Sequence, residues 1–154
     1  MVKVLFVCHG NVCRSPAAEF VMKNLVEKEG LQDYFEIASA ATSREELGNG
    51  VYPNMKEVLH AHGLNTSGKY ARQMNYQDYV YYDYLIGMDE ENRYYMERIC
   101  QGDEMHKISL LLDYSDYPRE LSDPWYSREF EKAYQEVVEG CTGLLNYLKK
   151  KGIE

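Results

Sequence analysis

The chain has 154 residues, of which 45% are hydrophobic, and this length and composition predict a single domain, residues 1–154, with its own core. The net charge of −8 argues against nucleic acid as a partner, and no apolar run approaches the roughly 20 residues that span a bilayer. Four cysteines are too few for a disulfide scaffold, so we expect a cytoplasmic protein that acts away from membranes.

The first predicted element is a buried strand, because residues 2–7 form a nearly continuous apolar and β-branched run. A helix is expected to begin at Ser15, whose hydroxyl can cap it, with Pro16 as its first residue and Gly30 as its terminator. A loop therefore lies between the carboxyl end of a strand and the amino end of a helix. Backbone N–H groups and the helix dipole favour an anion at such a place.

This loop carries the residue types that thiolate attack on a phosphoryl group requires. Gly10 and Asn11 tolerate left-handed backbone angles, which a tight ring of inward-pointing N–H groups needs. Arg14 has a planar guanidinium that can hold two phosphoryl oxygens, and its charge favours the thiolate form of Cys8. Ser15 can donate a hydrogen bond to the sulfur. The pattern indicates a reactive cysteine rather than an inert buried one.

Further strands and helices are predicted to alternate along the chain. The expected strands are 35–39, 84–88 and 108–112, and the expected helices are 55–62, 90–100 and 127–151. The last helix carries an apolar stripe that includes Cys141, which indicates a core position for this thiol. The fold class is therefore α/β: an open, mostly parallel four-stranded sheet with helices on both faces and a phosphate-binding loop after the first strand. Ligands of such sheets bind beyond the carboxyl ends of the strands, where Cys8 falls.

The late segment Asp123-Pro124-Trp125-Tyr126 can complete such a site. Departure of an aryl oxygen requires a proton, since the pKa of tyrosine is about 10, and Asp123 can supply it. Trp125 and Tyr126 can wall a cleft around a phenyl ring. Considered alone, an Asp-Pro pair is more typical of an ordinary turn than of a catalytic site.

The run from Phe6 to Glu19 resembles the amino-terminal signature of low-molecular-weight protein tyrosine phosphatases. The resemblance continues in order along the chain, at 39–43, 71–73, 83–84, 88–90 and 123–126. It implies hydrolysis of phosphotyrosine in protein substrates through a phosphocysteine intermediate, with inorganic phosphate as product. It implies no cofactor and no metal, with Cys8 as nucleophile, Arg14 as phosphate ligand and Asp123 as general acid.

The resemblance also implies a wider set of residues around the substrate: His9, Gly10, Asn11, Val12, Cys13, Ser15, Glu45, Trp125 and Tyr126. Ser39 is implied to support the loop through hydrogen bonds. Asp89 either pairs with a basic side chain or stands at the amino end of a helix, and both interpretations stay open. Cys13 either forms a reversible disulfide with Cys8 under oxidation or packs beneath the loop, and these alternatives also stay open.

Four positions depart from the family pattern. Trp125 replaces the first of two tyrosines that often follow Asp-Pro, which keeps an aromatic wall but loses a hydroxyl. His9 follows the nucleophile where a small or apolar residue is usual. Glu45 stands where many relatives carry an aromatic wall. Residues 68–70, Gly-Lys-Tyr, occupy the stretch in which many relatives have a histidine that supports the loop asparagine. Substrate preference and loop support are therefore expected to differ from those of common relatives.

The same residues argue against other functions. Arsenate reductases of this fold need extra cysteines near the third strand, and residues 81–90 contain none. Protein-arginine phosphatases carry a threonine where this chain has the apolar Val12. Phosphocysteine carrier modules lack the late acid that Asp123 would provide. A zinc site from Cys8, His9 and Cys13 is disfavoured by its spacing.

Overall fold

The computed structural model describes residues 1–153 and contains a four-stranded sheet in the order β2-β1-β3-β4, in which every pairing is parallel. The strands are β1 (Val2–Cys8), β2 (Phe35–Ala41), β3 (Tyr84–Gly87) and β4 (Ile108–Leu110). The α-helices are α1 (Arg14–Lys28), α2 (Pro53–Ala61), α3 (Tyr76–Tyr81), α4 (Glu90–Ile99), α5 (Pro124–Ser127) and α6 (Phe130–Lys151). Two short 3-10 helices are η1 (Gln32–Tyr34) and η2 (Leu111–Tyr114).

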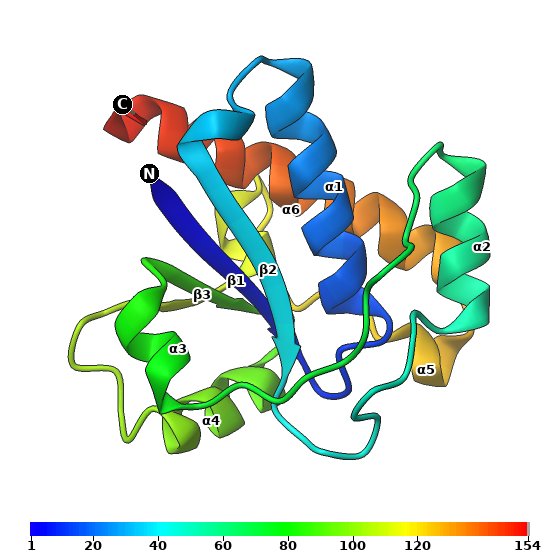
Figure 1. Cartoon of the computed structure of the whole chain (residues 1–154), viewed down its shortest axis with the longest axis horizontal. Helices are drawn as coiled ribbons and strands as arrows, with labels where there is room; N and C mark the ends of the chain where they lie inside the picture. Colours follow the sequence, from blue (N-terminus) through cyan, green and yellow to red (C-terminus); the bar gives the residue numbers. More distant parts are fainter. Residues whose placement is uncertain (154) are drawn as a thin grey trace.

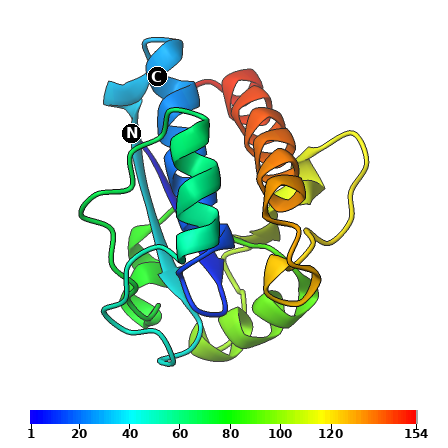
Figure 2. The same cartoon turned by 90° about the vertical axis from the view of Figure 1, so that its right-hand side faces the viewer.

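Strand β1 is buried on both faces, as its nearly continuous apolar sequence predicts. Val4 and Phe6 point into a core shared with α1, α2 and α6, whereas Leu5 and Val7 point into a second core shared with α3 and α4. None of these four residues is exposed. Figures 1 and 2 show the helices on the two sides of the sheet, with α6 beside α1 and α2. The predicted α/β fold with a parallel sheet and helices on both faces is therefore confirmed.

The prediction that Ser15 caps the first helix is wrong. Helix α1 already begins at Arg14, with Cys13 at the N-cap and no side-chain capping bond, so Pro16 is the third helical residue and not the first. The hydroxyl of Ser15 instead contacts Cys8 and Asn11, and it is therefore not available to the helix backbone. The carboxyl end of the helix agrees with the prediction, since Gly30 adopts a left-handed φ of 70° just after it.

The strand expected at 108–112 is shorter than predicted. It ends at Leu110, whose backbone N–H donates to the Asp113 carboxylate, and the chain then turns into η2. Leu111 and Leu112 are fully buried in the core of α1, α2 and α6. An apolar run could not distinguish a strand from this buried turn.

The helix expected at 127–151 is divided in two. Arg128 adopts a left-handed φ of 62° at the end of α5, so α6 begins only at Phe130. Helix α3 was not predicted, because its six residues are too few for a periodic pattern. Its start is set by a capping box in which Asn75 and Asp78 bond each other's backbone N–H groups.

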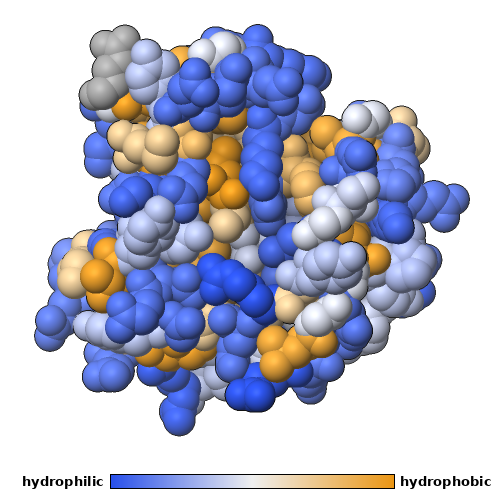
Figure 3. Space-filling model, viewed as in Figure 1, coloured by the Kyte–Doolittle hydropathy of each residue, from blue (hydrophilic) through white to orange (hydrophobic). Residues whose placement is uncertain are grey.

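The face of the molecule in Figure 3 is mostly hydrophilic, with apolar side chains in scattered patches. Within residues 1–153, no helix combines the length and the apolar character that crossing a membrane would require.

The close approach of α6 to η2 depends on Gly143. A Cβ atom there would lie 2.0 Å from the backbone oxygen of Tyr114, which cannot move aside as a side chain can. We expect Gly143→Ala to lower the free energy of unfolding by about 3 kcal/mol, even though alanine is more favourable in a helix than glycine by roughly 1 kcal/mol. Urea denaturation would measure this loss of stability. Gly140→Ala is the matched control, because its Cβ would meet only the Leu111 side chain, so it should lower the free energy of unfolding by less. A loss for Gly143→Ala equal to or smaller than that for Gly140→Ala would contradict this account.

Candidate active site

The loop between β1 and α1 places Cys8 at the carboxyl end of the central strand, next to the start of the helix. Asn11 adopts the expected left-handed conformation, with a φ of 57°. The Cys8 sulfur lies 3.0 Å from the Ser15 hydroxyl oxygen, and Cys8 is only 4% exposed. The loop therefore presents its sulfur at the bottom of a cavity and not on an open surface.

A chain of hydrogen bonds beneath the loop leads away from this sulfur. Asn11 Nδ2 donates to Ser15 Oγ at 2.8 Å and to Ser39 Oγ at 2.9 Å, and Ser39 Oγ donates to Glu19 Oε1 at 2.5 Å. A carboxylate only accepts hydrogen bonds, so Ser39 directs its proton to Glu19. Both amide protons of Asn11 are then used, which leaves the Ser15 proton for the sulfur of Cys8. The buried carboxylate thus sets the direction of every bond in the chain.

Lys69 occupies the region in which many relatives carry a histidine. Its ammonium donates to the backbone oxygen of Ser39 at 3.0 Å and lies 3.5 Å from Glu19 Oε1. Burial lowers the pKa of Lys69, and the charge of Glu19 partly opposes this shift. Lys23 pairs with the other oxygen of Glu19 at 2.6 Å. Lys69 and Glu19 thus both bond Ser39, whose hydroxyl oxygen accepts a hydrogen bond from the loop asparagine Asn11.

We expect Lys69→Met to lower the free energy of unfolding by about 2 kcal/mol, because Glu19 would keep its buried charge with one partner fewer. Urea denaturation would measure the loss. Lys23→Met is the matched control, since Lys23 contacts the same carboxylate from a half-exposed position and should cost under about 1 kcal/mol. A larger loss for Lys23→Met would show that Lys69 is not the main partner.

Arg14 crosses the floor of the site and joins three segments. Its Nη1 donates to the backbone oxygen of Leu121 at 2.9 Å, and its Nη2 donates to Asp89 Oδ2 at 2.9 Å and approaches Asp123 Oδ2 at 3.5 Å. Burial acts to lower the pKa of Arg14, but the negative charges of Cys8, Asp123 and Asp89 outweigh it and raise that pKa. Arg14 therefore stays charged beside the sulfur.

Both interpretations of Asp89 hold in the structure. Its Oδ1 accepts from the backbone N–H of Asn92, which caps helix α4, while its Oδ2 accepts from Arg14. The same carboxylate therefore starts a helix and orients the guanidinium.

Asp123 lies at the amino end of α5, with Pro124 as the first helical residue. Its Oδ1 accepts from the backbone N–H of Trp125 at 3.0 Å, and its side chain is 31% exposed. Trp125 and Tyr126 are both exposed and extend beside the same opening. The predicted acid Asp123 and the predicted aromatic walls, although more than 100 residues later in the chain, thus lie at the same cleft as the loop after β1.

These groups surround one cleft with a volume of about 500 Å³. Its lining includes all three residues predicted to carry the chemistry and seven of those predicted to contact the substrate, namely Cys8, Arg14, Asp123, His9, Gly10, Val12, Cys13, Glu45, Trp125 and Tyr126. The side chains of Asn11 and Ser15 bond beneath the loop instead. At the mouth, His9 Nε2 contacts a carboxylate oxygen of Glu45.

Two carboxylates of the lining, Glu46 and Glu91, were missed by the sequence analysis. Neither belongs to a motif, and each reaches the cleft only because its segment folds beside the loop. Within residues 1–153 there is no group of three or more histidine, cysteine or acidic side chains that could hold a metal ion.

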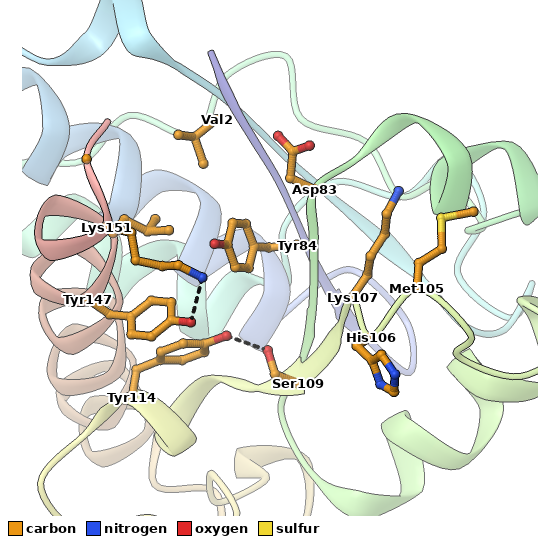
Figure 4. Close-up of a pocket in the computed structure, with 12 residues that line it drawn as sticks. Val2, Asp83, Tyr84, Met105, His106, Lys107, Ser109, Tyr114, Tyr147 and Lys151 are labelled. Atoms are coloured by element: carbon orange, nitrogen blue, oxygen red, sulfur yellow. Dashed lines mark hydrogen bonds between the residues drawn. The ribbon is translucent and has the colours of Figure 1, made fainter. Parts of the chain in front are cut away.

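A second cavity, of about 510 Å³, lies at the amino ends of strands β1 and β3, the opposite end of the sheet from Cys8 (Figure 4). Lys151 donates to the Tyr147 hydroxyl at 3.2 Å, and the hydroxyls of Tyr114 and Ser109 lie 2.8 Å apart. None of the predicted site residues lines this cavity, so the predicted chemistry belongs to the cleft around Cys8.

All four cysteines are free thiols, and their surroundings differ. Burial raises the pKa of Cys13, Cys100 and Cys141, that of Cys100 to about 12, so these three stay protonated at neutral pH.

We expect iodoacetate to alkylate Cys8 alone, since the thiolate is the reactive form, and inorganic phosphate to protect it. Peptide mass spectrometry would locate the adduct. Modification of Cys13 at a similar rate would contradict this prediction.

A parallel α/β fold with a cysteine, an arginine and a late aspartate around one cleft is the arrangement of a cysteine-dependent phosphatase. The chain belongs to the family described as low molecular weight phosphotyrosine protein phosphatase, whose model matches residues 3–153.

The relatives agree over nearly the whole chain. Low molecular weight protein-tyrosine-phosphatase YfkJ of Bacillus subtilis (strain 168) is 36% identical and covers 98% of each chain, and its crystal structure superposes with a TM-score of 0.94 over 99% of this chain and 97% of that one. The low molecular weight phosphotyrosine protein phosphatase of Sus scrofa is 37% identical over 95% of each. A drosophila arginine phosphatase is 32% identical, with a TM-score of 0.87 over 96% of this chain and 98% of that one.

Proposed function

We propose that this protein hydrolyses phosphotyrosine in protein substrates, with Cys8 as nucleophile, Arg14 as phosphate ligand and Asp123 as general acid. The observation that carries the proposal is the convergence of the three side chains on one cleft, with Arg14 within 3.5 Å of Asp123. Nothing in their sequence separation requires this convergence.

In the first step, a lone pair of the Cys8 thiolate attacks phosphorus and forms an S–P bond while the P–O bond to the aryl ring breaks. The electrons of the broken bond go to the aryl oxygen, which takes the proton of Asp123. Arg14 and the backbone N–H groups of the loop hold the three remaining oxygens. The products are a dephosphorylated tyrosine side chain in the protein substrate and a phosphocysteine in the enzyme.

In the second step, a water oxygen attacks phosphorus and transfers a proton to the Asp123 carboxylate. The S–P bond breaks and its electrons return to sulfur, which releases inorganic phosphate. Ser15 stabilises the departing thiolate because its proton is directed to Cys8 by the hydrogen bonds that begin at Glu19. The cycle ends with the thiolate and the protonated Asp123 restored.

The walls of the cleft favour an aryl substrate. Trp125 and Tyr126 offer ring faces for a phenyl group on its way to Cys8. Glu45, Glu46 and Glu91 place three carboxylates in the lining, so acidic residues next to the phosphotyrosine are expected to be disfavoured. A cytoplasmic location is part of the same proposal, since a cysteine nucleophile needs reducing surroundings.

A phosphoarginine phosphatase is the second candidate, because an arginine phosphatase is among the similar structures. Val12 supports the first candidate: it is apolar and lines the cleft, whereas a resemblance to arginine phosphatases would imply threonine there.

The test is hydrolysis of matched peptides that contain phosphotyrosine, phosphoserine or phosphoarginine, followed as phosphate release. We expect kcat/KM for the phosphotyrosine peptide to exceed the other two by at least about 100-fold. Faster release from the phosphoarginine peptide would replace the first candidate by the second. Release from none of them, with phosphate still bound, would indicate a binding module.

A further inference from the structure

The segment that carries Asp123 rests on a stack of aromatic rings. The ring of Trp125 meets the edge of Tyr52 with 5.0 Å between centroids, and Tyr52 stacks on Phe130 at 5.7 Å with 18° between their planes. These contacts join Trp125 of α5 and Phe130, the first residue of α6, to Tyr52, the residue just before α2. Aromatic pairs of this geometry contribute beyond the area that they bury.

Arg128 closes the stack from the other side. Its guanidinium lies 5.6 Å from the Tyr52 centroid and 5.2 Å from the Phe130 centroid, and its Nη2 donates to the Tyr52 hydroxyl at 3.1 Å. Arg128 is also the left-handed residue that ends α5, a conformation that persists in non-glycine residues only when the surroundings hold it. The turn after the acid is therefore fastened to Tyr52.

Tyr52 is bonded to the phosphate loop as well. Its backbone N–H donates to the backbone oxygen of Val12 at 2.8 Å. On the other side, Trp125, whose ring rests on Tyr52, uses its own backbone N–H to hold Asp123 Oδ1 at 3.0 Å. One residue therefore contacts the loop of the nucleophile and the segment of the acid, and nothing in the sequence motifs indicates it.

We propose that Tyr52 is a positioning residue that sets the place of Asp123 relative to Cys8. Arg128, which contacts the Tyr52 ring, has the same positioning role. This inference rests on the proposed function, in which Asp123 protonates the leaving aryl oxygen. The Tyr52 side chain acts through its contacts with Trp125, Phe130 and Arg128, and the backbone bond from Tyr52 to Val12 does not depend on that side chain. Its loss should therefore impair proton delivery and leave the sulfur, Arg14 and the loop as they are.

Proton delivery can be separated from nucleophilic attack by the leaving group. Phenyl phosphate releases a strongly basic phenolate that needs the proton, whereas 4-nitrophenyl phosphate releases a much weaker base that does not. For Tyr52→Leu we expect kcat/KM to fall about tenfold or more with phenyl phosphate and to stay within about twofold with 4-nitrophenyl phosphate. Tyr52→Phe keeps the rings and loses only the bond from Arg128, so its loss should be smaller and of the same kind.

The control is Tyr94→Leu on helix α4. Tyr94 also accepts a hydrogen bond from an arginine, Arg98, at 3.2 Å, but it does not contact the segment that carries Asp123. It should leave both substrates unaffected. Equal losses with both substrates in Tyr52→Leu, or none with either, would overturn the proposal. If Tyr52→Leu does not fold, Arg128→Met decides by the same two substrates.

Failure of this proposal can be distinguished from failure of the proposed function. Asp123→Ala must itself show the difference between the two substrates; if it does not, Asp123 is not the acid and the proposed function fails. If it does and the Tyr52 and Arg128 variants do not, only the positioning role fails. Alkylation of Cys8 at the wild-type rate in each variant would show that the loop is intact.

Discussion

Cys8→Ser is expected to lower the turnover of phosphotyrosine by at least about 10⁴-fold while the variant still binds phosphate. Serine has nearly the same shape, but its hydroxyl stays protonated at neutral pH and no base contacts it. The neighbour at 3.0 Å is Ser15, whose proton already points towards position 8. Phosphate release would measure the loss, and intact-protein mass spectrometry would show no added phosphoryl group.

Cys100→Ser is the matched control, because Cys100 is a buried thiol in the core between the sheet and α4, away from the cleft. Its turnover should equal that of the wild type once the protein is folded. Phosphate should raise the melting temperature of Cys8→Ser as it does that of the wild type, since Arg14 and the loop remain. Turnover by Cys8→Ser near the wild-type rate would exclude Cys8 as the nucleophile.

The features that the sequence predicts correctly are those decided by neighbours in the chain. Residues 2–7 are apolar except for Lys3, and a strand with that pattern is typical of a sheet covered on both faces. Asn11 adopts the left-handed conformation that a tight turn of the loop requires, whereas Gly10 does not. Strand, loop and helix therefore follow from about 30 consecutive residues.

The features that the sequence does not predict depend on partners far apart in the chain. The sequence leaves open whether Asp89 pairs with a basic side chain, and that partner, Arg14, lies 75 positions away. Lys69 reaches Ser39 across 30 positions. A lysine between a glycine and a tyrosine resembles any solvated loop residue, and only the fold shows that its ammonium is buried beside Glu19. No sequence motif marks Tyr52 either, because its proposed positioning role depends on aromatic rings about 75 residues later in the chain.

The cap of α1 shows a conflict between local and functional preferences. By propensity alone, Ser15 is a good capping residue. The structure places it one residue inside the helix, where its hydroxyl links Asn11 to the sulfur of Cys8. Local reasoning fails here because the loop uses the hydroxyl for a longer-range contact.

Asp123→Asn is expected to lower kcat/KM for phosphotyrosine by about 10²- to 10⁴-fold, the usual contribution of a general acid. The amide oxygen of asparagine can still accept from the backbone N–H of Trp125, so the start of α5 is preserved, but no proton can be donated. Asp123→Ala, which also loses that bond, should show at least as large a loss. Steady-state rates with a phosphotyrosine peptide would measure both.

The same variant separates the two steps of the cycle. With 4-nitrophenyl phosphate the leaving group departs without a proton, so Cys8 should still be phosphorylated. Hydrolysis of the phosphocysteine needs the Asp123 carboxylate as a base, so the intermediate should accumulate in Asp123→Asn. Rapid quenching in alkali and mass spectrometry should then find one phosphoryl group on the peptide that contains Cys8. Its absence, together with a full rate on phosphotyrosine, would show that another group transfers the proton.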